Sequence, residues 1–174
     1  MDVAVTAGDI SKMEADVIVV NLFQGVTSPG GGTEAVNNAL DGAIGRLIEL
    51  GDIRGKFGEL TLLHTFGKIA APRVLVAGLG KQDEFDLKAV RNLSGTVARY
   101  CQQPNIRTLA TTAHGAGIAG LDPNDCAQAV TEGALLGTYS FLRYKTDLRD
   151  DDKAELEQLT IVELDGARVE GMTT

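Results

Sequence analysis

The chain has 174 residues, which is enough for one hydrophobic core and too few for two domains of ordinary size. Hydrophobic residues make up 44% of it but aromatic residues only 5%, so the core must be mainly aliphatic. The net charge of −8 opposes attraction to nucleic acids and to anionic membranes, and we expect neither as a partner. The chain starts without a basic segment leading into an apolar stretch, and no apolar run approaches the roughly 20 residues that span a bilayer, which predicts a cytoplasmic protein.

The first half of the chain predicts four strands and one long helix. Short apolar runs at residues 3–6 and 17–20 predict the first two strands, and residues 60–64 and 74–77 the next two. Between these pairs a helix is expected to begin at Thr33, a residue type suited to an N-cap. The apolar positions that recur there at helical spacing are Val36, Leu40, Ala43, Ile44, Leu47 and Ile48.

The second half continues the alternation of helices and strands. A helix is predicted from Asp86, a strand over 108–113 and a second helix from Asp122, followed by Pro123 at the first helical position. The inner face of that helix is made of small residues, so we expect it to lie very close to the sheet. Those residues are Cys126, Val130, Gly133 and Gly137. The alternation as a whole predicts a single layered α/β domain.

The character of the sequence changes after Tyr144, where a charged segment is followed by a last predicted strand at 159–164. We therefore divide the chain into an α/β core at residues 1–146 and a charged linker with the last strand at 147–174. Three consecutive aspartates at 150–152 could in principle bind a metal, but they lack companion ligands, and a solvated turn is expected.

The residue types that carry catalysis are sparse. The chain has no His-Glu-x-x-His motif, no cysteine pair at metal-ligand spacing and no serine nucleophile elbow. His114 stands where a strand opens into a glycine loop, but it has no identifiable carboxylate partner and is expected to be structural, as is His64. Cys101 and Cys126 fall within helical patterns and are expected to be small buried hydrophobic residues. No catalytic residue or metal ligand is predicted here.

The glycine loop itself has two interpretations. Gly115-x-Gly117-x-x-Gly120 lies between a predicted strand and a helix start, where backbone N–H groups and the helix dipole can hold a phosphate. The same glycines would equally permit a tight turn and close packing of the helix. The sequence leaves both interpretations open.

Four segments occur in the order that is typical of macro domains, which bind ADP-ribose. They are 8–10, 15–19, 30–32 and 117–120. This resemblance implies that Asp9 and Ile10 lie at the adenine end of a ligand and the late glycine loop at its phosphates. The ligand-binding residues that we predict are Asp9, Ile10, Gly31, Gly32, Gly115, Gly117, Ile118 and Gly120. Val20 and Phe23 stand where macro domains usually carry the asparagines that hold the distal ribose, so ADP-ribose is expected to bind weakly or not at all.

A second resemblance covers nearly the whole chain. Segments 73–81, 132–141, 143–145 and 159–163, with Arg91, resemble the N-terminal domain of leucyl (cytosol) aminopeptidases. That domain is similar in fold to macro domains. The resemblance therefore implies a macro-domain-like layered α/β fold, with a mixed, mostly parallel sheet flanked by helices.

The same resemblance implies where catalysis would take place. Leucyl aminopeptidases release N-terminal amino acids with two divalent metal ions, zinc or manganese, held by a lysine and carboxylates in a C-terminal domain. We expect that domain to begin beyond Thr174, so this chain is predicted to be non-catalytic and to serve packing, assembly or regulation in a homo-oligomer, a hexamer by resemblance. The alternative is a macro-type module that binds ADP-ribose or a related nucleotide, and a third possibility is an independent hydrolase.

Overall fold

The computed structural model describes residues 1–116, 120–144 and 155–164 of the chain, and within α4 it describes the side chains as far as Tyr139. Six strands form one sheet in the order β1-β6-β5-β2-β4-β3. The strands are β1 (Asp2–Ala7), β2 (Val17–Phe23), β3 (Leu60–His64), β4 (Arg73–Gly80), β5 (Thr108–Thr112) and β6 (Gln158–Glu163). All neighbours are parallel except β3, which pairs with β4 in the antiparallel sense. The predicted mixed, mostly parallel sheet is confirmed.

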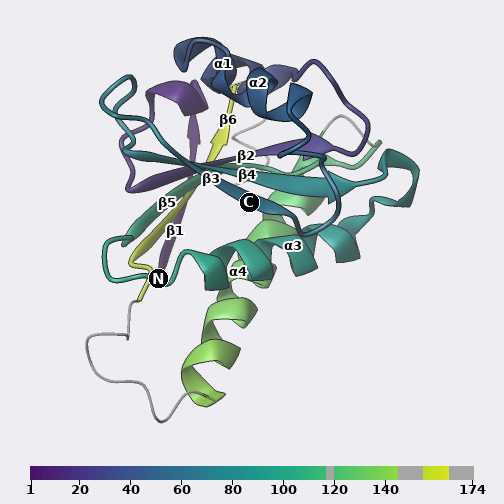
Figure 1. Ribbon diagram of the computed structural model, residues 1–174. Helices are drawn as coiled ribbons and strands as arrows, with labels where there is room; N and C mark the ends of the chain where they lie inside the picture. The colour runs from purple at the N-terminus through teal and green to yellow at the C-terminus, as the bar shows by residue number, and fades with distance from the viewer. Residues whose placement is uncertain (117–119, 145–154, 165–174) are drawn as a thin grey trace.

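Helices cover both faces of the sheet (Figure 1). One face carries α1 (Gly31–Ala39) and α2 (Ala43–Glu49), and the other carries α3 (Leu87–Tyr100) and α4 (Pro123–Tyr144). Two short 3-10 helices, η1 (Ile10–Lys12) and η2 (Gln82–Glu84), complete the described elements. Because side chains alternate along a buried strand, Ile18 and Val20 of β2 join the aliphatic core under α1 and α2, whereas Val17 and Val19 join the core under α3 and α4.

The predicted long helix of the first half is in fact two helices. Asp41 and Gly42 have φ angles of 55° and 81°, and two left-handed residues in succession end α1 before α2 begins. The N-cap of α1 is Gly30, so the prediction of Thr33 as the cap was wrong. Thr33 lies inside the first turn, where its hydroxyl donates to the backbone oxygen of Asn21 at 2.6 Å. That bond attaches the start of α1 to the end of β2.

The small face of α4 packs mainly on another helix, not on the sheet. An added Cβ on Gly137 would lie 2.7 Å from the Cα of Gly95 in α3, and one on Gly133 would press on the backbone of Arg91 in the same helix. Cys126 and Val130, nearer the start of α4, do lie in the core. The pattern identified the small face correctly, but helical periodicity does not say which neighbour such a face meets.

The last predicted strand is an interior strand of the sheet. β6 pairs with β1 on one side and with β5 on the other, both in parallel. This last strand therefore belongs to the same sheet as the five strands that precede it in the sequence. The aspartates at 150–152 lie outside the described residues, and the proposed division at 146/147 and the domain expected beyond it stay predictions.

Candidate functional site

A cavity of about 460 Å³ opens at the carboxyl ends of β1, β2, β5 and β6, beside the first turn of α1. Its walls include residues 8–10 after β1, Asn21 in β2, residues 30–33 at the start of α1, Thr112 at the end of β5 with residues 113, 115 and 116 after it, and residues 162–164 at the end of β6. Mostly parallel α/β sheets hold their ligands at this edge, because the loops that follow the strands converge there. The cavity is therefore the candidate binding site.

Five of the eight predicted site residues line this cavity. They are Asp9, Ile10, Gly31, Gly32 and Gly115. Gly120 is described but does not line it, and Gly117 and Ile118 lie outside the described residues. The structure thus brings together segments that are more than a hundred residues apart in the sequence, while ligand binding by them stays a prediction.

Asp9 is held at one end of the cavity as the N-cap of η1. Its Oδ1 accepts hydrogen bonds from the backbone N–H of Ser11 at 2.9 Å and from the Ser11 hydroxyl at 2.7 Å. The hydroxyl bond is the main cause that lowers the pKa of this carboxyl, so Asp9 is charged at neutral pH. Glu163 also lines the cavity, and no lysine or arginine does so among the described residues. A ligand phosphate would depend on backbone N–H groups.

The start of α1 can supply such groups. Gly30 caps the helix with no side-chain hydrogen bond, which leaves first-turn N–H groups without a side-chain partner. Gly31 has a φ of 56°, a conformation that glycine adopts without strain. A Cβ on Gly32 would lie 3.1 Å from side-chain carbons of Ile10 and Thr112, which also line the cavity. A larger residue at position 32 would therefore press on two other lining residues.

Asn21 is the site residue that the sequence analysis missed. Val20 and Phe23 are buried in the two cores, and Asn21, between them in β2, lines the cavity. The prediction that Val20 and Phe23 remove the polar groups of the ribose end stays a prediction, and Asn21 adds one polar side chain to this end of the strand. A signal was present, because a polar residue in the otherwise apolar run Val17–Phe23, near the carboxyl end of its strand, is unusual for a buried parallel strand.

His114 lies behind Asn21, almost completely buried at 1% exposure. Its Nδ1 is 3.1 Å from the Asn21 Nδ2, and its Nε2 is 3.4 Å from the Thr111 Oγ1. Burial lowers the pKa of the imidazole to about 4, so the ring is neutral at neutral pH. Neither of these two partners is a carboxylate, and the ring does not line the cavity itself.

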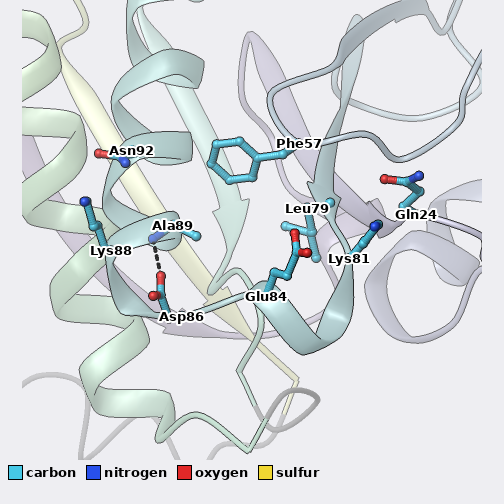
Figure 2. Close-up of a pocket in the computed structure, with 10 residues that line it drawn as sticks. Gln24, Phe57, Leu79, Lys81, Glu84, Asp86, Lys88, Ala89 and Asn92 are labelled. Carbon is cyan, nitrogen blue, oxygen red and sulfur yellow. Dashed lines mark hydrogen bonds between the residues drawn. The ribbon is translucent and has the colours of Figure 1, made fainter.

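A second hollow of about 290 Å³ lies between the end of β4, η2 and α3 (Figure 2). Phe57 forms one wall, and Lys81, Glu84 and Lys88 are among the charged lining residues. The remaining carboxylate, Asp86, is used as the N-cap of α3 and accepts from the backbone N–H of Ala89 at 2.8 Å, as the dashed line in Figure 2 shows. These side chains form a solvated surface of mixed charge rather than a converging site.

Within the described part of the chain, no group of three or more His, Cys, Asp or Glu side chains could hold a metal ion. Cys101 and Cys126 are buried free thiols, and desolvation raises their pKa values to about 12 and about 11. Over the same residues, no helix is long and apolar enough to cross a membrane.

A mostly parallel sheet between two pairs of helices, with a cavity at its carboxyl edge beside a glycine-rich helix start, defines a macro-domain fold. Solved structures agree. A macrodomain from Trypanosoma brucei, determined in complex with ADP-ribose, matches 98% of this chain over 67% of its own length with a TM-score of 0.69 and 18% identity. A variant of tomato leucine aminopeptidase matches 99% of this chain over 35% of its own, with a TM-score of 0.68 and 17% identity.

Sequence comparison is more specific. The family model of the cytosol aminopeptidase family, N-terminal domain, matches residues 19–148, and the chain belongs to this family. A probable cytosol aminopeptidase of Roseiflexus castenholzii is 33% identical over 162 residues, which are 93% of this chain. The chain spans about 30% of the length of that relative.

Proposed function

We propose that this chain is the non-catalytic, assembly-forming domain of a leucyl-type aminopeptidase of the cytoplasm. The family match over residues 19–148, together with the small share of the relative's length that the chain spans, carries this proposal. Release of N-terminal amino acids would belong to a following domain, where a lysine and carboxylates would hold two zinc or manganese ions. The present chain would pack on that domain and on like subunits of a homo-oligomer, a hexamer by resemblance.

The outer surface of α4 supports an assembly role. Leu136 and Tyr139 are each 64% exposed, and Leu135 is 43% exposed. Apolar side chains grouped on one helix are typical of surfaces that another protein covers. Figure 1 shows that the last turns of α4 extend beyond the sheet, so this helix can reach a neighbouring domain.

The first experiment measures hydrolysis of a leucine amide with added Mn²⁺ or Zn²⁺, by the 174-residue chain and by the full product of its gene. We expect turnover only from the full product, because a binuclear site needs clustered ligands. Turnover by the 174 residues that is lost when residues within them are mutated would refute the proposal. A gene that ends at Thr174 would refute it as well.

The second experiment tests the surface of α4 in the full gene product. Leu136→Glu should weaken assembly, measured by sedimentation, because a charge in an apolar contact is costly to desolvate. Leu50→Glu is the matched control, since Leu50 is 73% exposed at the end of α2, on the other side of the sheet. Equal sedimentation of the two variants would remove α4 from the interface.

A macro-type module for ADP-ribose or a related nucleotide is the second candidate function, and the presence of Asn21 in the cavity favours it. Calorimetric titration with ADP-ribose tests this candidate. Binding should be lost in Asp9→Ala and in Gly32→Val, whose side chain would press on Ile10 and Thr112, and retained in Gly45→Ala, where an added Cβ has room. Absence of heat at probe concentrations of about 1 mM would exclude this function.

A further inference from the structure

A groove of about 340 Å³ lies between α3 and α4, on the face of the sheet opposite α1 and α2. Its floor is made of three glycines, which let the two helices approach along their backbones: Gly95, Gly133 and Gly137. The other described lining residues are Arg91, Asn92, Thr96, Arg99 and Leu136. The described lining of the groove thus includes two arginines and no acidic residue.

The helix α3 is basic in a chain that is acidic overall. It carries Lys88, Arg91 and Arg99 and no Asp or Glu, and residues 133–144 of α4 contain no Asp or Glu either. All 24 acidic residues of the chain therefore lie outside α3, and the net charge of the whole chain is −8. A second copy of the chain presents carboxylates in excess, and opposite charges across an interface favour its formation.

Arg99 differs from Arg91 in having no carboxylate partner among the described residues. The Arg91 Nε donates to the carboxylate of Glu132 in α4 at 2.6 Å. About two helical turns later, the Arg99 Nη2 donates to the Thr96 hydroxyl at 3.4 Å. The Arg99 Nη1 lies 3.5 Å from the position that a Cβ on Gly95 would take, so the guanidinium folds back over the groove. A guanidinium has five N–H groups, and most of them are left for a ligand.

Exposed apolar side chains lie beside this cation. Leu136 lines the groove at 64% exposure, and Tyr139, three residues later in α4, is exposed to the same extent. A free anion would cover the guanidinium and leave these side chains in water, whereas a protein surface covers both. Arginine and tyrosine are also among the residue types that contribute most to binding energy at protein interfaces. The combination favours a carboxylate that belongs to a protein as the ligand of the groove.

We propose that the groove between α3 and α4 receives a carboxylate side chain of a like subunit, which Arg99 binds through two parallel N–H groups. Leu136 and Tyr139 then pack on apolar atoms around that carboxylate. A two-point ion pair of this kind fixes the geometry of the contact and selects an acidic partner surface. This inference rests on the proposed function, since it assumes that α4 faces another subunit. It adds the chemistry of the partner and the residue that recognises it.

The role of Arg99 is tested in the full gene product by sedimentation at about 50 mM and about 500 mM NaCl. At the lower salt Arg99→Gln should raise the dissociation constant of the assembly about tenfold, as for one lost charged hydrogen bond, and Arg99→Glu should raise it further. The wild-type assembly should weaken with salt, and that of Arg99→Gln much less. Arg46→Gln is the matched control and should leave assembly unchanged, since Arg46 is exposed on α2, across the sheet.

The occupant of the groove is identified with Arg99→Lys, which keeps the positive charge and provides an amine. A water-soluble carbodiimide joins a lysine amine to a carboxylate in contact with it, and an amide bond forms. We expect a product of twice the subunit mass on a denaturing gel, above the wild-type background and absent from Arg46→Lys. Mass spectrometry of the digested product then identifies the carboxylate that lies against position 99.

The possible failures are distinguishable. Weaker assembly in Leu136→Glu with no effect of Arg99→Gln or Arg99→Glu would overturn the inference and leave the proposed function in place. A cross-link of Arg99→Lys within one chain would overturn the like subunit as the partner and assign the carboxylate to a following domain. No effect of any of these variants on assembly would refute the proposed role of α4 and this inference with it. Because Arg99 is exposed, its variants should keep the wild-type Tm, and if they do not, the cross-link decides.

Discussion

Substitution of Gly133 or Gly137, the glycines through which α4 contacts α3, tests the packing of the two helices most directly. A Cβ on Gly137 would lie 2.7 Å from the Cα and 2.8 Å from the O of Gly95. Carbon atoms in contact prefer about 3.5–4.0 Å, so the helices would have to separate by roughly an ångström. The atoms in the way belong to backbone, and no side-chain rotation can relieve the contact. Even Gly137→Ala should therefore destabilise the protein.

The expected magnitude is the balance of two effects. Overpacking of this kind costs about 1–3 kcal/mol, and alanine returns up to about 1 kcal/mol through its higher helix propensity. Gly137→Leu adds further atoms to the same contact and should lie at or beyond the upper end of the range. For a domain of this size each kcal/mol corresponds to a Tm change of about 2–4 °C. Gly133→Ala, pressed on the backbone of Arg91, should behave in the same way.

Thermal unfolding followed by circular dichroism measures this effect, with Gly45→Ala as the matched control. Gly45 also lies inside a helix, but the nearest atoms to an added Cβ are those of the Asn37 side chain at 3.7 and 3.8 Å. The same substitution should there leave the Tm unchanged or raise it. If Gly137→Ala and Gly45→Ala shift the Tm equally, the close approach of α3 and α4 is wrong.

Three further predictions concern buried and capping groups. Burial lowers the pKa of His114 from 6.5 to about 4, so between these pH values the unfolded chain binds a proton that the folded chain does not. The free energy of unfolding present above pH 6.5 should therefore fall by about 3 kcal/mol toward pH 4. Urea unfolding measures this fall, and His114→Phe should show a flatter pH dependence. The Asp122 carboxylate accepts hydrogen bonds from the backbone N–H groups of Asn124 and Asp125 at 2.8 and 3.3 Å. Asp122→Ala should therefore lower the free energy of unfolding by about 1 kcal/mol in the same assay. An unchanged urea midpoint would contradict a capping role of Asp122. Cys101 and Cys126 should react with a thiol reagent at pH 8 only after unfolding, because burial raises both pKa values, and fast reaction of the folded protein would contradict their placement.

The fold was largely predictable because its signals are local. A buried strand such as β4 is a short apolar run, and the starts of α3 and α4 carry Asp86 and Asp122, whose carboxylates accept hydrogen bonds from backbone N–H groups of the first turn. The break between α1 and α2 was missed because the apolar spacing continues across it. Only the left-handed backbone at Asp41 and Gly42 interrupts the helix, and the spacing of apolar residues does not reveal backbone angles.

The site residues that could be predicted are those in loops with a recognisable local backbone conformation. Glycines and the capping Asp9 belong to loops whose chemistry is visible in the sequence. The polar side chains at and behind the cavity wall are different, because Asn21, Thr111 and His114 are brought together by the pairing of β2 with β5, which joins residues about ninety positions apart. A single sequence carries no information on that pairing. His114 therefore appeared as an isolated histidine, although its ring contacts two polar side chains.

The two candidate functions use different parts of the molecule and can therefore coexist. The cavity is built from strand ends and the start of α1, whereas the exposed apolar residues Leu136 and Tyr139 lie on α4, on the opposite face of the sheet. Neither residue lines the cavity. A domain that joins an assembly through α4 would thus contribute no cavity residue to that contact. Substitutions at Leu136 and at Asn21 should consequently separate assembly from ligand binding, because sites with no shared partners affect free energies independently.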